Sequence, residues 1–447
     1  MNLPLDFIEY TKKLLGNEWD SFLSSLSTES PISVRFNNKL QPKLKNEHVM
    51  WCDSGFYLNE RPSFTFDPLF HAGTYYVQEA SSMFLEQVVK QYITTPVIAL
   101  DLCAAPGGKS THLSQLLPPE SLLISNEIVR SRAFVLSENI QKWGNCNNVV
   151  TNNSPSDFSS FRGLFDFILV DAPCSGEGMF RKDFDSIKEW SLKNVEMCAD
   201  RQKNIIQHIW DSLKENGILV YSTCTYNQEE NEKNVAWITK HFDAEILHLQ
   251  TNPQWGIVEN DFGYHFFPHK TKGEGFFISI LQKKEQSSAI KIKHKPSQTT
   301  KINLDVLLEK DMLKVIQNNQ FFYAVPDKHL EHISFLQKNL NLIHAGIPLY
   351  EQKGKDFIPL TGLTLSKYFN KENTLTHELD YESAICFLQK ENFILDISHK
   401  GYIAVCHKNT PLGWIKNLGN RFNNLYPTEW RIRSKNVTKN IQYLLNV

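Results

Sequence analysis

The sequence predicts an α/β protein whose central part is a doubly wound, mostly parallel sheet. From residue 97 onward, short apolar runs alternate with segments whose apolar spacing suits helices. Parallel strands are buried on both faces and form continuous apolar runs, so this alternation favours a sheet covered by helices. Three of the runs end in loops that carry acids or cysteines. In such sheets, the loops at the carboxyl ends of the strands form the ligand-binding crevice.

The first 94 residues are predicted to form a small α/β module. Helical spacing of apolar residues covers 5–15 and 79–92, and a strand-like stretch lies at 32–36. At about 150 residues per domain, a chain of 447 residues has room for roughly three domains. This module is the first of them.

The second predicted domain spans residues 95–283. Its strands are expected at 97–102, 122–125, 167–170, 218–221 and 276–281. Its helices are expected at 109–117, 130–143 and 198–214.

A polar, lysine-rich stretch at 284–300 predicts a solvated linker. The third region, 301–447, combines short helices with strand-like stretches at 321–325, 393–395 and 402–405. We detect no internal repeat in the sequence.

Composition excludes several classes of protein. Hydrophobic residues make up 41% of the chain and charged residues 21%, which is enough apolar material for a core. The 47 basic and 49 acidic residues give a net charge of −2, which excludes a histone-like polycation but permits a local basic groove. The sequence has no run of about 18 apolar residues and no secretory signal at its start. We therefore expect a soluble, cytoplasmic protein without a membrane span.

The eight cysteines are too sparse for a disulfide scaffold, and no two form a C-x-x-C pair typical of structural zinc. His265 and His269 have H-x-x-x-H spacing, but Pro268 breaks the helix that a metal pair at this spacing needs. We therefore expect no metal.

The first chemical motif is LDLCAAPGGKS at 100–110, an apolar strand followed by a Pro-Gly-Gly turn and a helix. Glycines let the backbone approach a ligand closely, and the exposed start of a helix favours an anionic group. On the glycines alone, a tight turn without a ligand is an equal alternative. Glu127 follows the next predicted strand, where an acid can accept hydrogen bonds from ribose hydroxyls. Together the two elements indicate a cofactor that contains adenosine.

Two further strands place cysteines at the same edge of the sheet. The stretch FILVDAPCSGEG at 167–178 places Asp171 and Cys174 after one strand, and GILVYSTCTY at 217–226 places Cys224 after another. Because the carboxyl ends of parallel strands face one crevice, we expect these side chains to converge beside the cofactor. Either cysteine alone is typical of an inert buried thiol, whereas the pair indicates a function.

Methylation of a pyrimidine ring uses such a set of groups. Carbon 5 of a pyrimidine is a poor nucleophile, and addition of a thiolate at carbon 6 makes it reactive toward an electrophilic methyl group. A nearby acid can hydrogen-bond the ring at N3 as charge builds there. The C5 proton must then leave and the thiol must be eliminated, so a second polar group at the site is useful.

These motifs resemble those of the NOL1/NOP2/Sun family of RNA (cytosine-5) methyltransferases. The resemblance covers residues 30–283 and includes SVRFN at 33–37, DLCAAPGGKSTHLSQLL at 101–117, VDAPCSGEGMFRKD at 170–183, STCTYNQEENEKNV at 222–235 and HFFPHKTKGEGFFISIL at 265–281. The segment 413–432 is similar to the carboxyl-terminal end of the bacterial RsmF/YebU subgroup, which modifies 16S ribosomal RNA near the decoding site.

The resemblance implies three parts: an RNA-recognition-like α/β module at 1–94, a Rossmann-type class I methyltransferase core at 95–283, and a PUA-like α+β RNA-binding region at 301–447. It also implies catalytic roles for matching residues. Cys224 matches the nucleophile that attacks carbon 6, and Cys174 matches the cysteine that helps to resolve the covalent intermediate. Asp171 matches the acid that orients the target base.

The implied cofactor is S-adenosylmethionine. The matching cofactor loop consists of Cys103, Ala104, Ala105, Pro106, Gly107, Gly108 and Lys109. Glu127 matches the ribose-binding acid, and Asp171 lies next to the cofactor as well. Family members often carry an aspartate near the adenine, after the third strand. Here Ser154 occupies that position, and Asp157 can substitute only if the loop folds back.

The implied partner is RNA, namely 16S ribosomal RNA or the 30S subunit, and a monomer suffices. The target base must be unpaired or flipped out, because a stacked base cannot present carbon 6 to a thiol. Candidate RNA contacts are Arg35, Lys182, Arg421 and Arg431. Arg35 is also a candidate for a structural bridge between the first module and the core.

Three alternatives stay open at this point. The core motifs do not encode the substrate, so a transfer-RNA cytosine-5 methyltransferase comes first, although the carboxyl-terminal extension favours ribosomal RNA. A non-catalytic RNA-binding or ribosome-assembly factor is the second, but it would not require Cys224 or the glycine turn. A DNA cytosine-5 methyltransferase is the third. Such enzymes take their nucleophile from the Pro-Cys motif, which leaves Cys224 unexplained.

Overall fold

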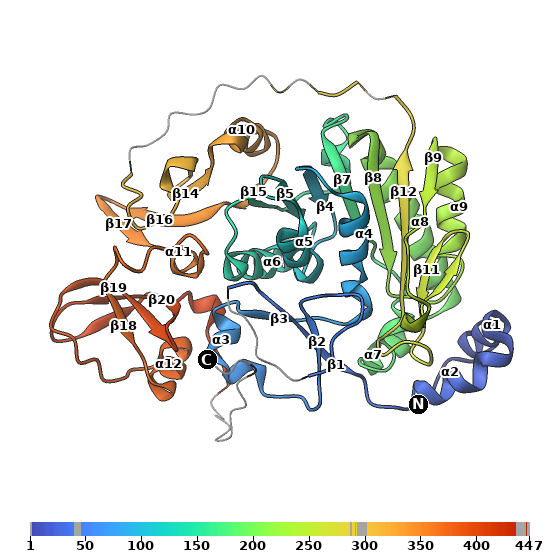
Figure 1. Cartoon of the computed structure of the whole chain (residues 1–447), viewed down its shortest axis with the longest axis horizontal. Coiled ribbons are helices and arrows are strands. Elements are labelled where there is room, and N and C mark those ends of the chain that lie inside the picture. Colours follow the sequence, from blue (N-terminus) through green and yellow to red (C-terminus); the bar gives the residue numbers. More distant parts are fainter. Residues whose placement is uncertain are drawn as a thin grey trace.

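The computed structural model of this chain describes residues 2–39, 46–286, 288–290, 292, 302–434 and 444. A ten-stranded sheet forms its centre (Figure 1). The strands of this sheet are β4 (Ile98–Asp101), β5 (Leu122–Asn126), β6 (Asn148–Thr151), β7 (Phe165–Asp171), β8 (Leu213–Thr223), β9 (Ala244–Leu247), β10 (Val258–Asn260), β11 (Gly263–Phe266), β12 (Phe276–Lys283) and β15 (Leu342–Ala345).

The strand order is β10-β11-β12-β8-β7-β4-β5-β6-β15, and β9 pairs with β12. The five strands from β6 to β8 run parallel, whereas β12 and β15 pair antiparallel with β8 and β6. The predicted doubly wound α/β core is confirmed. All its parallel strands point their carboxyl ends toward one edge, where the motif loops lie.

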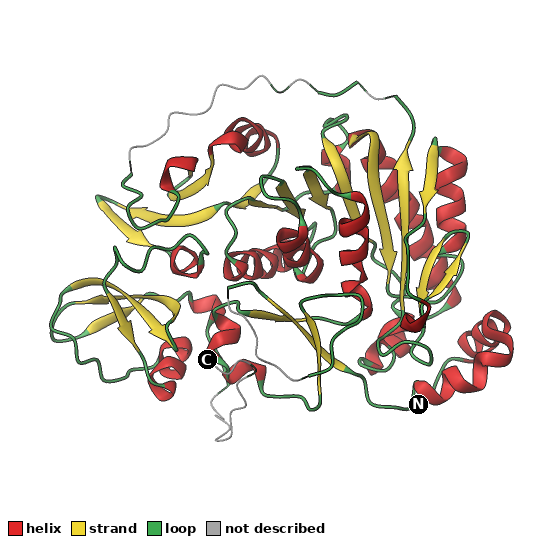
Figure 2. Ribbon diagram, in the orientation of Figure 1, coloured by secondary structure: helices red, strands yellow, loops and turns green. Residues whose placement is uncertain are grey.

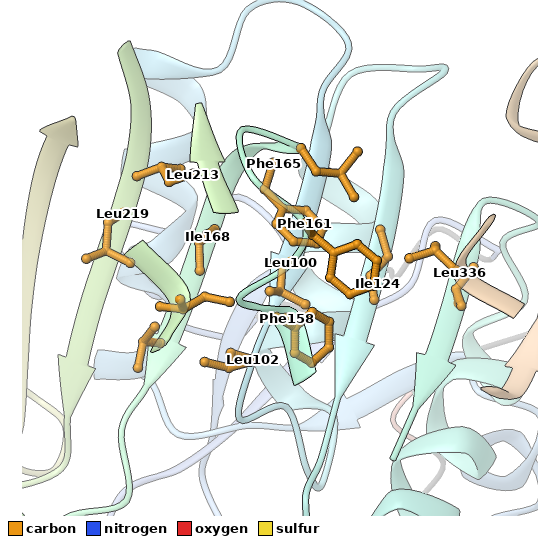
Figure 3. Close-up of a cluster of buried hydrophobic side chains, with 14 of the residues drawn as sticks. Leu100, Leu102, Ile124, Phe158, Phe161, Phe165, Ile168, Leu213, Leu219 and Leu336 are labelled. Atoms are coloured by element: carbon orange, nitrogen blue, oxygen red, sulfur yellow. The ribbon is translucent and has the colours of Figure 1, made fainter. Parts of the chain in front are cut away.

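Helices cover both faces of the sheet (Figure 2). They are α4 (Leu85–Tyr92), α5 (Gly108–Leu116), α6 (Arg130–Trp143), α7 (Phe184–Glu189), α8 (Leu192–Ile209) and α9 (Glu232–His241). Consecutive residues of a strand face opposite sides, so Ala99 packs with α4 and α5 whereas Leu100 packs with α8 and α9. Figure 3 shows the second of these clusters, in which Leu336 from the carboxyl-terminal region joins Leu100 and Ile124 from the sheet.

The amino-terminal module consists of helices and a three-stranded antiparallel sheet in the order β2-β1-β3. Its elements are α1 (Leu5–Leu15), α2 (Trp19–Ser25), β1 (Ile32–Phe36), β2 (Gly55–Leu58), α3 (Pro68–His71) and β3 (Tyr75–Val77).

Arg35 on β1 is fully buried, which contradicts the predicted RNA contact and supports the structural alternative. Its guanidinium donates to Gln78 at 2.7 Å and to Thr111 on α5 at 2.6 Å, and it stacks on Trp143 at 4.4 Å. It therefore fixes the amino-terminal module on the core.

The carboxyl-terminal region contains two further four-stranded sheets. The first has β13 (Leu313–Asn318), β14 (Phe321–Pro326), β16 (Ile347–Lys353) and β17 (Asp356–Pro359), with helices α10 (Leu330–Asn339) and α11 (Thr361–Leu365). The second has β18 (Thr376–Glu378), β19 (Gly401–His407), β20 (Thr410–Asn417) and β21 (Phe422–Asn424), with α12 (Tyr381–Gln389). Strand β15 comes from this region but completes the central sheet. Most of the predicted linker at 284–300 lies outside the described residues, and the predicted domain boundaries stay a prediction.

Two predicted elements are wrong. The helix expected at 198–214 is α8, which begins six residues earlier and ends at Ile209, because residues from Leu213 already belong to β8. Residues 393–395 form no strand. Phe393 is half-buried against Phe422 of β21, at a centroid distance of 4.7 Å, although its own segment pairs with no strand. No helix in the described part of the chain has the length and apolar character of a membrane span.

Candidate active site

The predicted cofactor loop connects β4 to the first turn of α5. Gly107 has a φ of +116°, a left-handed conformation that disfavours any residue with a side chain. A cavity of about 170 Å³ lies against this loop. It is lined by Tyr76, Val77, Gln78, Glu79 and Ser82 from the amino-terminal module and by Asp101, Cys103, Ala104, Ala105, Pro106, Gly108, Lys109 and Asp171 from the core. The contribution of the amino-terminal module was not predicted.

Asp101 at the end of β4 has an unsatisfied oxygen in this cavity. Its Oδ2 accepts a 2.6 Å hydrogen bond from Ser110, whereas its buried Oδ1 has no partner. Burial raises the pKa of Asp101 to about 7. A buried polar atom without a partner is rare in native proteins, and here it lies in a cavity that the glycine turn also borders. The residues present therefore fit a polar ligand with donor groups, such as an adenosine cofactor.

Glu127 lies at the carboxyl end of β5, as predicted, and is buried. Its Oε1 accepts a 2.9 Å hydrogen bond from the Val129 amide, and its Oε2 lies 3.6 Å from Arg132 Nη1. Arg132 also donates to the Ala105 carbonyl at 2.9 Å. Arg132 thus connects the predicted ribose-binding acid to the cofactor loop, a link that no sequence signal indicated.

Ser154 follows β6 and does not belong to the described lining of the cofactor cavity. The loop folds back on itself here. The Ser154 amide donates to Asp157 Oδ2 at 2.9 Å, and the Asn153 side chain donates to the same oxygen at 3.0 Å. The Asn153 hydrogen bond is the main reason that the pKa of Asp157 is lowered. Asp157 is therefore held at Ser154 as an ionised carboxylate.

The two motif cysteines converge at the carboxyl ends of β7 and β8. Cys174 Sγ lies 3.0 Å from Cys224 Sγ, and the Cys224 amide donates to Cys174 Sγ at 3.3 Å. Both side chains are partly exposed. The hydrogen bond with Cys224, together with burial, raises the pKa of Cys174 well above its usual range. Cys174 therefore retains its proton at neutral pH.

Asp171 connects the cysteines to the cofactor cavity. Its Oδ2 accepts a 2.7 Å hydrogen bond from Lys109 Nζ, and its Oδ1 accepts a 2.8 Å hydrogen bond from Ser222 Oγ on β8. The side chain of Asp171 is still 34% exposed. The structure thus brings together Asp171, Lys109, Cys174 and Cys224, as the sequence predicted.

Two buried carboxylates position the cysteine loops. Glu230 accepts hydrogen bonds from the Ser175 amide at 3.0 Å, from Gln202 at 2.7 Å and from Asn227 at 2.8 Å. Glu177 accepts hydrogen bonds from Trp190 Nε1 at 2.9 Å and from the Tyr226 amide at 2.8 Å.

Each of these acids belongs to one cysteine loop and binds a group of the other, so the two acids join the loops. Burial raises the pKa of Glu230. Sequence reasoning missed both acids, although each lies in a stretch that carries the resemblance.

The other predicted basic contacts lie outside this cluster. Lys182 is exposed, and its Nζ lies 3.8 Å from Glu274 Oε1. Arg421, just before β21, and Arg431, just after the helical turn at Thr428–Trp430, are exposed in the carboxyl-terminal region.

Potential metal ligands are engaged by other groups. His265 and His269 lie 2.9 Å and 3.3 Å from two different carboxylates, those of Glu232 and Glu18. The ligand atoms of Cys52, Glu86 and His112 form a buried group within 4.8 Å, in which Glu86 also pairs with Lys90 at 2.7 Å.

Comparison with known proteins places this geometry in a family. Residues 94–282 match the family model of the 16S rRNA methyltransferase RsmB/F, residues 3–80 the N-terminal domain of 16S rRNA methyltransferase RsmF, and residues 374–432 the methyltransferase RsmF PUA domain. The "Ribosomal RNA small subunit methyltransferase F" of Aliivibrio fischeri is 30% identical over 409 residues, covering 86% of this chain and 85% of the relative. The protein of that name from Shewanella oneidensis is 29% identical over 424 residues, covering 89% and 88%.

The chain belongs to the ribosomal RNA small subunit methyltransferase F family.

Solved structures agree with this family. A methyltransferase homolog from Pyrococcus horikoshii is 28% identical with a TM-score of 0.53, covering 62% of this chain and 93% of that one. NSun6 from Pyrococcus horikoshii, solved with SFG, is 21% identical with a TM-score of 0.54, covering 63% and 99%, and shares the fold. The predicted family, the methyltransferase activity, the use of S-adenosylmethionine and the carboxyl-terminal PUA domain are confirmed.

Proposed function

We propose that this enzyme methylates carbon 5 of a cytosine in 16S ribosomal RNA through a covalent bond between Cys224 and carbon 6. The observation that carries the proposal is the 3.0 Å approach of the two thiols beside Asp171, which itself contacts the cofactor cavity through Lys109. The printed names of the relatives, which refer to ribosomal RNA of the small subunit, support the substrate class.

The cofactor cavity supplies the geometry for S-adenosylmethionine, which carries an electrophilic methyl group when bound. Cys103 to Lys109 form its base, and the unpartnered Oδ1 of Asp101 offers an acceptor there. Glu127, held by Arg132, is our candidate for the ribose hydroxyls. Ser154 remains the candidate for the adenine side, with Asp157 bound to its amide.

The two cysteines have different roles in the covalent steps of the reaction. Cys224 Sγ adds to carbon 6 of the base, which makes carbon 5 nucleophilic. After methylation the proton on carbon 5 must leave, and the bond between Cys224 Sγ and carbon 6 must break. Cys174 Sγ lies 3.0 Å from Cys224 Sγ and keeps its proton, so it can give that proton to the Cys224 thiolate as the bond to carbon 6 breaks, while the carbon-5 proton goes to solvent water.

Asp171 is the candidate that selects cytosine. Lys109 and Ser222 hold its two oxygens, and carboxylate oxygens accept from the N4 amino group of cytosine in other complexes. Uracil carries a carbonyl oxygen at that position. This oxygen is itself an acceptor, so it cannot donate a hydrogen bond to the Asp171 carboxylate. We therefore assign Asp171 the role of orienting the base at its N4 amino group.

The test is transfer of tritiated methyl groups from S-adenosylmethionine to 30S subunits, naked 16S RNA and bulk transfer RNA. We expect label in 30S or 16S RNA, recovered as 5-methylcytidine, and none with Cys224→Ala. We expect Cys174→Ala to accumulate a covalent RNA–protein adduct on denaturing gels.

Label in transfer RNA alone would overturn the substrate and keep the chemistry. An adduct with Cys224→Ala but none with Cys174→Ala would exchange the two roles. A different methylated nucleoside would overturn the assignment of carbon 5.

A further inference from the structure

A second cavity, of about 470 Å³, lies where the amino-terminal module, the core and the two carboxyl-terminal sheets meet. Left of the centre of Figure 1, α3, α11 and β20 lie around this place. It shares no described lining residue with the cofactor cavity. Its lining consists of Asn38, Lys39, Ala72, Thr364, Leu365, Ser366, Lys367, Phe369, Lys371, Lys408, Asn409, Thr410 and Pro411.

Four lysines and no acidic residue belong to this described lining. Among the described residues, three of the lysines donate to uncharged acceptors. Lys367 donates to the Asn38 side chain, and Lys371 donates to Asn409 O at 3.0 Å and Oδ1 at 2.9 Å. A neighbouring acid, Glu378, accepts from the Asn409 amide at 3.1 Å. Positive charge is thus concentrated in one concave surface.

Lys39 explains why the walls of the cavity stay together. Its ammonium group has three protons, and they go to the carbonyls of Ala72, Lys142 and Leu365. These carbonyls belong to the amino-terminal module, to the end of α6 and to α11. Lys39 is therefore a structural residue whose donors are used up, and burial together with the nearby Lys367 lowers its pKa.

We propose that this lysine cavity binds backbone phosphates of the RNA substrate outside the catalytic crevice. Lysines in a concave, low-dielectric surface attract anions, and a strand of RNA presents a phosphate at every nucleotide. This inference rests on the proposed function, because it assigns part of the same RNA a second contact. It adds Lys367, Lys371 and Lys408 to the residues that hold the substrate.

The position of the cavity suits a strand that also reaches the cofactor loop. Helix α6 begins beside the cofactor loop, where Arg132 contacts Ala105, and ends at the cavity, where Gly144 O accepts from the Lys367 amide at 3.0 Å. Its 14 residues span about 21 Å. Stacked nucleotides rise about 3.4 Å each, so roughly six of them cover this distance.

Electrostatics within the protein supports an anionic occupant. Burial and the nearby Arg35 lower the pKa of Lys367 to about 8. A phosphate bound beside the ammonium group offsets both effects.

The experiment is filter binding of in vitro transcribed 16S RNA to the full chain between about 50 and 200 mM salt. The test variant carries Lys367→Gln, Lys371→Gln and Lys408→Gln. The matched control carries Lys240→Gln, Lys328→Gln and Lys353→Gln, which removes the same charge from exposed sites elsewhere. Circular dichroism melting and S-adenosylmethionine binding show that each variant is folded.

We expect the test variant to lower the slope of log K against log salt by about 2, since each single-strand phosphate contact contributes about 0.7. The control should leave the slope within about 0.5 of the unchanged protein. Equal slopes for the two variants would overturn the inference.

Inorganic phosphate provides a second arm. A shift of the melting temperature by 10 mM phosphate in the unchanged protein but not in the test variant, with equal RNA slopes, would indicate a free-anion site and would also overturn the proposal. Identification of the methylated nucleoside is an independent measurement. If the methylated atom proves not to be carbon 5, the RNA-binding slopes still show whether the lysine cavity binds phosphates.

Discussion

The catalytic crevice and the lysine cavity differ in how far their charged side chains are compensated by neighbouring groups. In the crevice, two of the carboxylates are surrounded by donors: Glu230 accepts from an amide and two side-chain amides, and Asp171 pairs with Lys109. In the cavity, Lys367 and Lys371 donate to neutral oxygens among the described residues. A site with satisfied charges holds its geometry before the substrate arrives, whereas a site with unbalanced charges is completed by its ligand.

The largest effect that tests this comparison is expected at Asp171. Asp171→Asn keeps the shape but leaves the ammonium group of Lys109 without its ion-pair partner and weakens the acceptor for the base. We expect kcat/KM to fall about 10²- to 10⁴-fold, the range for removal of a catalytic acid or base, with little change in melting temperature. Methyl-transfer kinetics and thermal melting measure the two quantities. A fall in melting temperature that accounts for the lost activity would mean that Asp171 acts only structurally.

The next effect concerns Glu230. Glu230→Gln presents an amide NH₂ to donors from Ser175, Gln202 and Asn227, so a buried donor faces other donors. We expect unfolding to become easier by about 1–3 kcal/mol, together with a loss of activity because the Cys174 loop is anchored at Ser175. Urea denaturation gives the first value. Glu229→Gln, at a more exposed neighbouring acid, is the matched control and should change stability by less than about 0.5 kcal/mol.

A smaller effect, of the opposite sign, is expected at Lys367. Its pKa is about 8 in the folded protein against an ordinary value of 10.5, so the folded state disfavours the charged form. This penalty is complete below pH 8 and disappears as the pH rises toward 10.5. Lys367→Gln should therefore stabilise the protein by about 1 kcal/mol at pH 7, after allowance for solvent screening at a partly exposed group.

The same substitution should have no stabilising effect near pH 10.5. Thermal melts of both proteins at pH 7, 9 and 10.5 check this dependence. A stabilisation that does not change with pH would show that packing, rather than charge, is responsible.

The smallest effect is expected at exposed lysines. Lys353 pairs with Glu351 at 3.1 Å on the surface, where ion pairs contribute at most about 1 kcal/mol. Lys353→Gln should change the melting temperature by no more than about 1 °C at any of these pH values. If Lys353→Gln raised the melting temperature as much as Lys367→Gln, the stabilisation would not be specific to lysines of the cavity.

The sequence predicted the parts of the site that follow one strand each. Asp171, Cys174 and Cys224 could be placed because a buried parallel strand puts the next residues at a known edge of the sheet. Contacts between loops could not be predicted in this way. Glu177 and Glu230 lie six and seven residues beyond the ends of β7 and β8, too far for the strand to fix their direction, and they bind groups up to 55 residues away.

Arg35 shows a second reason for failure. An arginine in a strand-like stretch of a presumed RNA-binding module favours an exposed contact, since arginine is seldom buried. Its burial depends on acceptors at Gln78 and Thr111 and on the ring of Trp143, which come from three different segments. Strand β15 was missed for a related reason: its four residues pair with β6, almost 200 residues earlier in the chain.

Strand β15 also bears on how the chain folds during synthesis. The ribosome releases β12, which ends at Lys283, about 60 residues before Ala345 completes β15. At 5–20 residues per second, the edge of β6 therefore stays open for roughly 3 to 12 s in every nascent chain. During this interval its free amide and carbonyl groups can recruit another strand. A fragment that stops at the end of the methyltransferase core keeps that edge open permanently, so aggregation is its expected fate.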